Sequence, residues 1–113
     1  MLDLLRIILE RAGYTFLAAE DGAEGLEKTR SEQPDLVLLD LMLPHVDGAE
    51  VLLRKQEDAS IQNIPVIAVT ALASPFDQVM WKWRTEIRAY VTKPFTRLQL
   101  LDTIEQVLAA QEN

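Results

Sequence analysis

Short apolar runs alternate along this chain with longer segments of helical periodicity, and few folds accommodate such a pattern. The apolar runs are residues 36–39 and 66–69, and residues 89–92 (AYVT) form a further short strand candidate. Runs of this length and character are typical of parallel strands that are covered on both faces. Helical segments between such strands predict βαβ units with right-handed crossovers. The sequence therefore predicts an α/β fold, with a mostly parallel sheet between two layers of helices.

Turn and capping residues divide the rest of the chain into helices and one further strand. Residues 2–12 have helical periodicity and end at Gly13, and residues 15–19 predict a fourth strand. Further helices are predicted at about residues 22–31, 49–57, 75–87 and 97–110. The apolar face of the first helix is formed by Leu4, Leu5, Ile8, Leu9 and Ala12. Asp21 and the pair Thr96 and Gln99 have the spacing of helix caps.

The composition fits one domain over residues 1–113 and excludes several classes of site. The chain has no cysteine and one histidine, His45, so disulfides, thiolate metal sites and multi-histidine metal cages are excluded. No apolar run approaches the roughly 20 residues that span a bilayer, so we expect a cytoplasmic protein without membrane contact. The net charge of −7 disfavours direct binding to nucleic acid.

Three predicted strands end in chemically complementary residues. Asp40 follows the run at 36–39, Thr70 follows 66–69, and Lys93 follows 89–92. The carboxyl ends of parallel strands meet at one edge of a sheet. There a carboxylate can attack a phosphoryl group, while a hydroxyl and an ammonium bind its oxygens. Singly, Asp40 fits the start of a loop, Thr70 a turn cap and Lys93 a solvated surface lysine, but jointly the three residues predict a phosphoryl-transfer site.

These motifs resemble those of the receiver domain of response regulators in two-component phosphorelays. The matching segments are residues 19–22 (AEDG), 35–44 (DLVLLDLMLP), 47–48 (DG), 64–71 (IPVIAVTA) and 90–95 (YVTKPF). The resemblance runs from Leu4 to about Ala110 and implies a three-layer, flavodoxin-like sheet of strand order 2-1-3-4-5. Met1 already falls inside what resembles the first helix, so the first strand is missing and about four strands are expected.

The resemblance also implies roles for single residues. Asp40 is expected to accept a phosphoryl group from a histidine kinase or a phosphotransfer protein, and Lys93 and Thr70 to bind its oxygens. Tyr90 matches the aromatic switch position that responds to Thr70, and a half-buried strand aromatic is the equal alternative. The implied function is signalling to a downstream protein. No enzymatic activity is expected beyond weak self-phosphorylation and self-dephosphorylation.

The family's Mg²⁺ ion would be held by Asp40, by the backbone carbonyl of Met42 and by an acidic pair that ends the first strand. That pair is absent here, and Asp3 lies on the polar face of its helix. A hard divalent cation with so few protein ligands keeps most of its water, so we expect weak binding. The alternative function is a pseudo-receiver, a protein-interaction module that works without phosphorylation. A haloacid-dehalogenase-type hydrolase is disfavoured, because it would need a second aspartate where this chain has Met42.

Two surfaces are predicted to contact other proteins. Trp81 projects away from the apolar face of its predicted helix, and an exposed indole favours an interface. Without the first strand, residues 36–39 would present an unpaired apolar edge. Either the strand at 15–19 slides inward to pair with that edge, or chains share strands across it. We expect the second outcome, a homo-oligomer.

Overall fold

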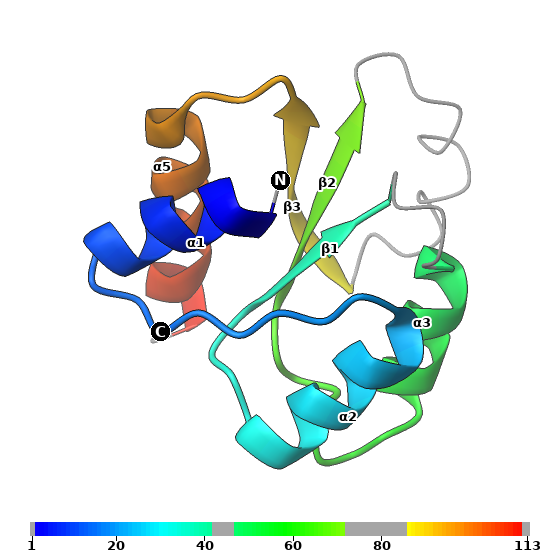
Figure 1. Cartoon of the computed structure of the whole chain (residues 1–113). Helices are drawn as coiled ribbons and strands as arrows, with labels where there is room; N and C mark the ends of the chain where they lie inside the picture. Colours follow the sequence, from blue (N-terminus) through cyan, green and yellow to red (C-terminus); the bar gives the residue numbers. More distant parts are fainter. Residues whose placement is uncertain (1, 42–46, 72–85, 112–113) are drawn as a thin grey trace.

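The computed structural model describes residues 2–41, 47–71 and 86–111, and within them a parallel sheet lies between helices on both faces (Figure 1). The strands are β1 (Val37–Asp40), β2 (Val66–Ala71) and β3 (Ile87–Lys93), in the spatial order β1-β2-β3. The helices are α1 (Leu2–Arg11), α2 (Gly22–Glu32), α3 (Gly48–Gln56) and α5 (Arg97–Gln111). This arrangement confirms the predicted α/β class.

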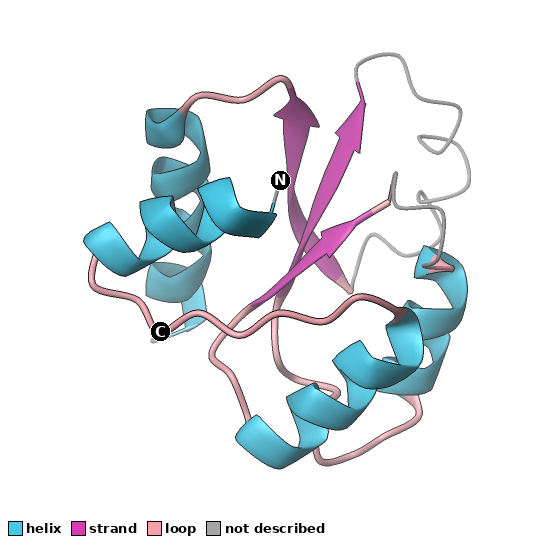
Figure 2. Ribbon diagram, viewed as in Figure 1, coloured by secondary structure: helices cyan, strands magenta, loops and turns pink. Residues whose placement is uncertain are grey.

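The two faces of the sheet carry two apolar cores. Figure 2 shows the helices in two groups, one on either side of the strands. On one face, side chains of α1 and α5 pack against Ile67 of β2 and Val91 of β3. On the other, Leu52 of α3 packs against Val66 and Ala68 of β2, and α2 lies beside α3. Leu52, Ile67 and Leu100 of α5 have no exposed surface. The central strand β2 therefore contributes side chains to both cores.

The strand predicted at residues 15–19 is not formed, so the described residues hold three strands instead of four. Side chains of neighbouring helices hold this segment in place. Lys28 of α2 donates a hydrogen bond to the carbonyl of Ala18, and the guanidinium of Arg6 lies 5.3 Å from the ring centre of Phe16. Strand structure needs a neighbouring strand, and the segment has not moved inward to pair with β1. The prediction failed because an apolar sequence does not by itself supply that neighbour.

The helix caps predicted at Asp21 and Thr96 are formed. Asp21 accepts a hydrogen bond from the backbone N–H of Glu24. Asp47, which the sequence pattern placed in a loop, caps α3 in the same way by accepting from the backbone N–H of Glu50. The backbone N–H of Thr96 donates to Gln99 Oε1, and the N–H of Gln99 donates in return to Thr96 Oγ1. The capping box at the start of α5 is thus confirmed.

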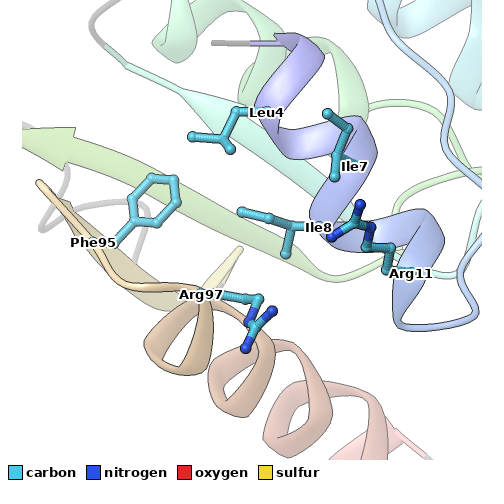
Figure 3. Close-up of a pocket in the computed structure, with 6 residues that line it drawn as sticks. All are labelled: Leu4, Ile7, Ile8, Arg11, Phe95 and Arg97. Carbon is cyan, nitrogen blue, oxygen red and sulfur yellow. The ribbon is translucent and has the colours of Figure 1, made fainter.

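Two packing predictions need correction. Leu4 was assigned to the core face of α1, but it is 54% exposed, whereas Ile8 and Leu9 are buried. Leu4 instead lines a pocket of about 500 Å³ between α1 and the residues that lead into α5, and Figure 3 shows it on the same side as Phe95. Ile87 begins β3 and does not end a helix. The predicted helix at 75–87 otherwise lies outside the described residues, as do Met42, His45 and Trp81.

A polar network joins α2 to the turn that follows α3. Asp58 accepts a hydrogen bond of 2.6 Å from the hydroxyl of Ser60 and one of 2.7 Å from Nε of Arg30. These bonds favour the ionised carboxylate, so the pKa of Asp58 falls from its ordinary value of 3.8 to about 2.

In the described residues no helix is long and apolar enough to cross a membrane.

Replacing Asp58 with asparagine is expected to remove a pH-dependent part of the stability. Because its folded-state pKa is depressed, Asp58 contributes fully above its ordinary pKa of 3.8, and the contribution is lost as the pH falls toward about 2. The urea midpoint of the wild type should therefore exceed that of Asp58→Asn at about pH 5, and the gap should close near about pH 2. A gap that stays constant over this range would contradict the assignment.

Candidate functional site

The predicted site residues come together at one edge of the sheet because the three strands are parallel. Asp40 ends β1 and is level with Val69 of β2. Lys93 ends β3 and is level with Ala71 of β2. Strands β1 and β3 both flank β2, so a long side chain from the end of β3 can reach across to β1.

Asp40 and Lys93 are in direct contact. Nζ of Lys93 donates a hydrogen bond of 2.6 Å to Oδ2 of Asp40, and the two groups form an ion pair. The side chains of Lys93 and Asp40 are 25% and 14% exposed, so water screens the pair only in part. The site therefore combines a carboxylate with a cation that offsets its charge, while both remain within reach of solvent.

Thr70 and Tyr90 have different surroundings on neighbouring strands. Thr70 follows Val69, which is level with Asp40, and it is buried, with 5% of its surface exposed. Tyr90 of β3 is 46% exposed and lies on the face of β3 that also carries the exposed Arg88 and Thr92. Thr70 thus lies on the strand between Asp40 and Lys93, and Tyr90 lies partly exposed on β3.

Gly48 lies beside the site, at the start of α3, and the sequence pattern did not predict its packing role. A Cβ atom at this position would lie 2.7 Å from Cδ2 of Leu41, the residue that follows Asp40. Real Cβ atoms essentially never show so short a contact. The Asp47-Gly48 motif therefore has two physical tasks: Asp47 caps α3, and Gly48 lets the start of α3 pack closely against the end of β1.

The donors available for Mg²⁺ do not form a cage. Among residues 2–41, 47–71 and 86–111 there is no group of three or more His, Cys, Asp or Glu side chains that could hold a metal ion. Asp40 contributes one carboxylate, and Oδ2 of that carboxylate is bound to Lys93. Octahedral Mg²⁺ prefers several oxygen ligands, so the described side chains do not fit a tightly bound ion.

Comparison with known proteins identifies the family. The response regulator receiver domain matches residues 1–105. The protein PilH of Pseudomonas aeruginosa is 40% identical over 105 residues, which cover 93% of this chain and 86% of PilH. The polar-differentiation response regulator DivK of Brucella anthropi is 36% identical over 107 residues, which cover 95% of this chain and 86% of DivK.

Solved structures agree with the sequence comparisons. A CheY-like response regulator receiver domain protein from Methanospirillum hungatei superposes with a TM-score of 0.83 at 33% identity, over 98% of this chain and 86% of that one. A putative response regulator from Chloroflexus aurantiacus superposes with a TM-score of 0.83 at 25% identity, over 95% of this chain and 87% of that one. These matches also support the flavodoxin-like class that the sequence predicted. The chain belongs to the response regulator receiver domain family.

Proposed function

We propose that this chain is a phosphorelay receiver in which Asp40 accepts a phosphoryl group from the phosphohistidine of a histidine kinase or a phosphotransfer protein. The supporting observation is the 2.6 Å contact between Asp40 and Lys93 at the sheet edge, with Thr70 on the strand between them. Receiver domains as a family are signalling domains that interact with histidine kinases and downstream targets. The proposal extends that role to named residues of this chain.

In the proposed step an oxygen of the Asp40 carboxylate attacks the phosphorus atom of the phosphohistidine. A P–O bond forms, the P–N bond breaks, and its electron pair returns to the imidazole ring. The ammonium of Lys93 offsets charge on the phosphoryl oxygens, and the hydroxyl of Thr70 donates a hydrogen bond to one of them. Without these two groups, repulsion between the negative phosphoryl oxygens and the Asp40 carboxylate would oppose the transfer.

Receiver domains typically bind Mg²⁺ at an acidic pocket, and we propose that this chain binds it weakly. Asp40 and the backbone carbonyl of Met42, which lies outside the described residues, are the ligands that the family pattern assigns. A titration of the unmodified protein with Mg²⁺, followed by the backbone amide signals around Asp40, is expected to saturate only at millimolar concentration. Saturation at micromolar concentration would contradict the proposed ligand set.

The proposed output is a change in protein contacts in the cytoplasm, with residues 1–113 acting as one domain. Movement of the Thr70 hydroxyl toward a phosphoryl group on Asp40 would leave space beside β3, and Tyr90 would turn into it. Trp81 is proposed as a further contact residue, and its place lies outside the described residues. No contact with nucleic acid or membrane is proposed.

Intact-mass measurement after incubation with a small acyl-phosphate donor tests the function directly. The wild type is expected to gain the mass of one phosphoryl group, and Asp40→Asn is expected to gain none. Asp35→Asn serves as the matched control, since it removes an exposed aspartate just before β1 and should still be labelled. A label that survives Asp40→Asn would reject Asp40 as the acceptor.

The pseudo-receiver is the second candidate, and one observation favours it. The described side chains supply no cage for the divalent cation that phosphorylation in the family uses. If the wild type stays unmodified under conditions that label an intact receiver, the protein acts by binding alone.

A further inference from the structure

Lys55 is buried in the core beneath α3, and the proposed phosphoryl-transfer site does not use it. It is 2% exposed and lies one helical turn after Leu52, so both side chains are on the same face of α3. The rest of that core is apolar and includes Val66 and Ala68 of β2 and Ile87, the first residue of β3. Lysine is almost never fully buried unless it is paired, so this environment is unusual.

The partner of Lys55 in the described part of the chain is a neutral carbonyl. Nζ donates one hydrogen bond of 3.1 Å to the carbonyl of Gln62. Lys28 and Lys93, the other described lysines, each have a carboxylate in ion-pair contact. An ammonium has three N–H donors and a full charge, so a single carbonyl compensates its burial poorly. A neutral amine fits the same place at a lower free-energy cost.

The charged groups around Lys55 do not replace a direct partner. Glu86, just before β3, favours the charged form of Lys55, whereas Arg88 on β3 disfavours it. On the side of the turn that follows α3, Asp58 is already bound by Arg30 of α2. Burial has the largest effect, and it lowers the pKa of Lys55 below its ordinary value of 10.5. Release of this side chain to water therefore favours proton uptake.

The turn that follows α3 is lightly anchored. Within residues 57–64 only Ile61 is buried. The bond from Lys55 to Gln62 and the ion pair between Asp58 and Arg30 are side-chain links between this turn and its helical neighbours. Segments with few buried apolar side chains open locally at a lower free-energy cost than the core of the sheet. The end of α3 and this turn can thus open while the strands stay paired.

We propose that Lys55 is a proton-linked latch between the end of α3 and the turn at residues 57–64. In the closed state a neutral amine donates to the carbonyl of Gln62. When Nζ takes up a proton from solvent, one N–H bond forms, the ammonium leaves the core for water, and the end of α3 opens together with the turn. Asp40 takes no part in this opening, so the inference and the proposed function succeed or fail separately.

An NMR titration of the wild type tests the protonation step directly. The Cε carbon signals of the lysines are followed from about pH 7 to about pH 12, a range that spans the ordinary lysine pKa. Lys55 is expected to titrate with a midpoint below 10.5. A midpoint at or above that value would overturn the proposal, whatever the variants below show.

Lys55→Met tests the opening, because it keeps a flexible side chain in the core but removes the charge. At about neutral pH it is expected to slow hydrogen exchange at the Gln62 and Ile64 amides by about tenfold. Both amides donate to carbonyls within the turn. Arg54→Met is the matched control: it introduces the same residue one position earlier, where the side chain is 61% exposed and paired with Glu50. It should leave exchange at the turn unchanged.

The pH dependence of stability should differ between the wild type and Lys55→Met. Because burial lowers the pKa of Lys55, the closed wild type binds fewer protons than the open or unfolded chain between that lowered pKa and 10.5. Its stability therefore rises with pH across this window. The urea midpoint of Lys55→Met should exceed that of the wild type at neutral pH, and the gap should shrink as the pH approaches 10.5.

Three results with the variant would overturn the latch. Equal or faster exchange at Gln62 in Lys55→Met would show that the buried lysine does not promote opening. Equal slowing at the Leu41 amide, which donates to the carbonyl of Val69 in the sheet, would show a global change in stability instead of a local one. A midpoint gap that stays constant from neutral to alkaline pH would show that opening takes up no proton. If Lys55→Met does not fold, the titration of the wild type still decides.

Discussion

Replacing Leu100 with alanine is expected to lower the free energy of unfolding by about 2–5 kcal/mol, the range for a large side chain removed from a packed core. Leu100 lies on α5 with no exposed surface and packs in the same core as Ile67 and Val91. Truncation would leave a cavity between α5 and the sheet that rigid neighbours fill only in part. Urea unfolding followed by circular dichroism measures the change as a shift in midpoint.

Leu98→Ala is the matched control, because it makes the same chemical change two positions away on the same helix. Leu98 is 67% exposed, so its loss should change the free energy of unfolding by no more than about 0.5 kcal/mol. Similar losses for the two variants would mean that α5 is rotated about its axis relative to the structure described above.

Replacing Lys93 with methionine is expected to slow phosphorylation of Asp40 by about 10²–10³, as when one preorganised donor is removed from a polar reaction site. The substitution keeps the length of the side chain but removes the ammonium that lies 2.6 Å from Asp40. Lys28→Met, which removes a half-exposed lysine of α2, is the control for loss of one positive charge elsewhere. The rate is read as the gain of phosphorylated mass with time.

The same variant tests the ion pair through stability. Lys93→Met leaves a mostly buried carboxylate without its cation, so the free energy of unfolding should fall by about 1–3 kcal/mol. Adding Asp40→Asn to Lys93→Met should recover most of this loss, because the carboxylate charge that Lys93 offset is then gone. If the two substitutions are simply additive, the contact contributes no coupling energy and the described geometry is not significant for folding.

Elements encoded by contiguous residues were predictable from the sequence. Strands β1 and β2 arise from uninterrupted apolar runs and β3 from a mixed one, and their predicted positions differ from the observed ones by at most two residues at either end. The caps at Asp21 and at the start of α5 also form as predicted. Such signals are local, since a cap needs only its own helix end and a buried strand is marked by a short apolar run.

The residues of the site were predictable from the sequence, but the contacts between them were less so. Parallel strands bring their carboxyl ends together, so Asp40, Thr70 and Lys93 were expected at one edge. Lys93 reaches Oδ2 of Asp40 across β2 because of the strand register, and the two residues lie 53 positions apart in the chain. The need for Gly48 beside Leu41 likewise arises only when α3 packs against β1.

Lys55 shows how packing can overrule a local pattern. A lysine is normally expected at the solvated surface, yet Lys55 is 2% exposed. Its Nζ donates a hydrogen bond to the carbonyl of Gln62. Burial disfavours the charged ammonium and so lowers the pKa of Lys55. Nothing near Lys55 in the sequence indicates this environment, because the turn around Gln62 creates it.

The sequence by itself determined the fold class, the order of the elements and the residue types at the strand ends, since all of these follow from short-range periodicity and chain direction. Only the tertiary structure decided that residues 15–19 remain outside the sheet. The physical reason is that a strand is completed by a neighbour that can be distant in the sequence. Helical periodicity is satisfied within one segment, but backbone pairing between strands is not.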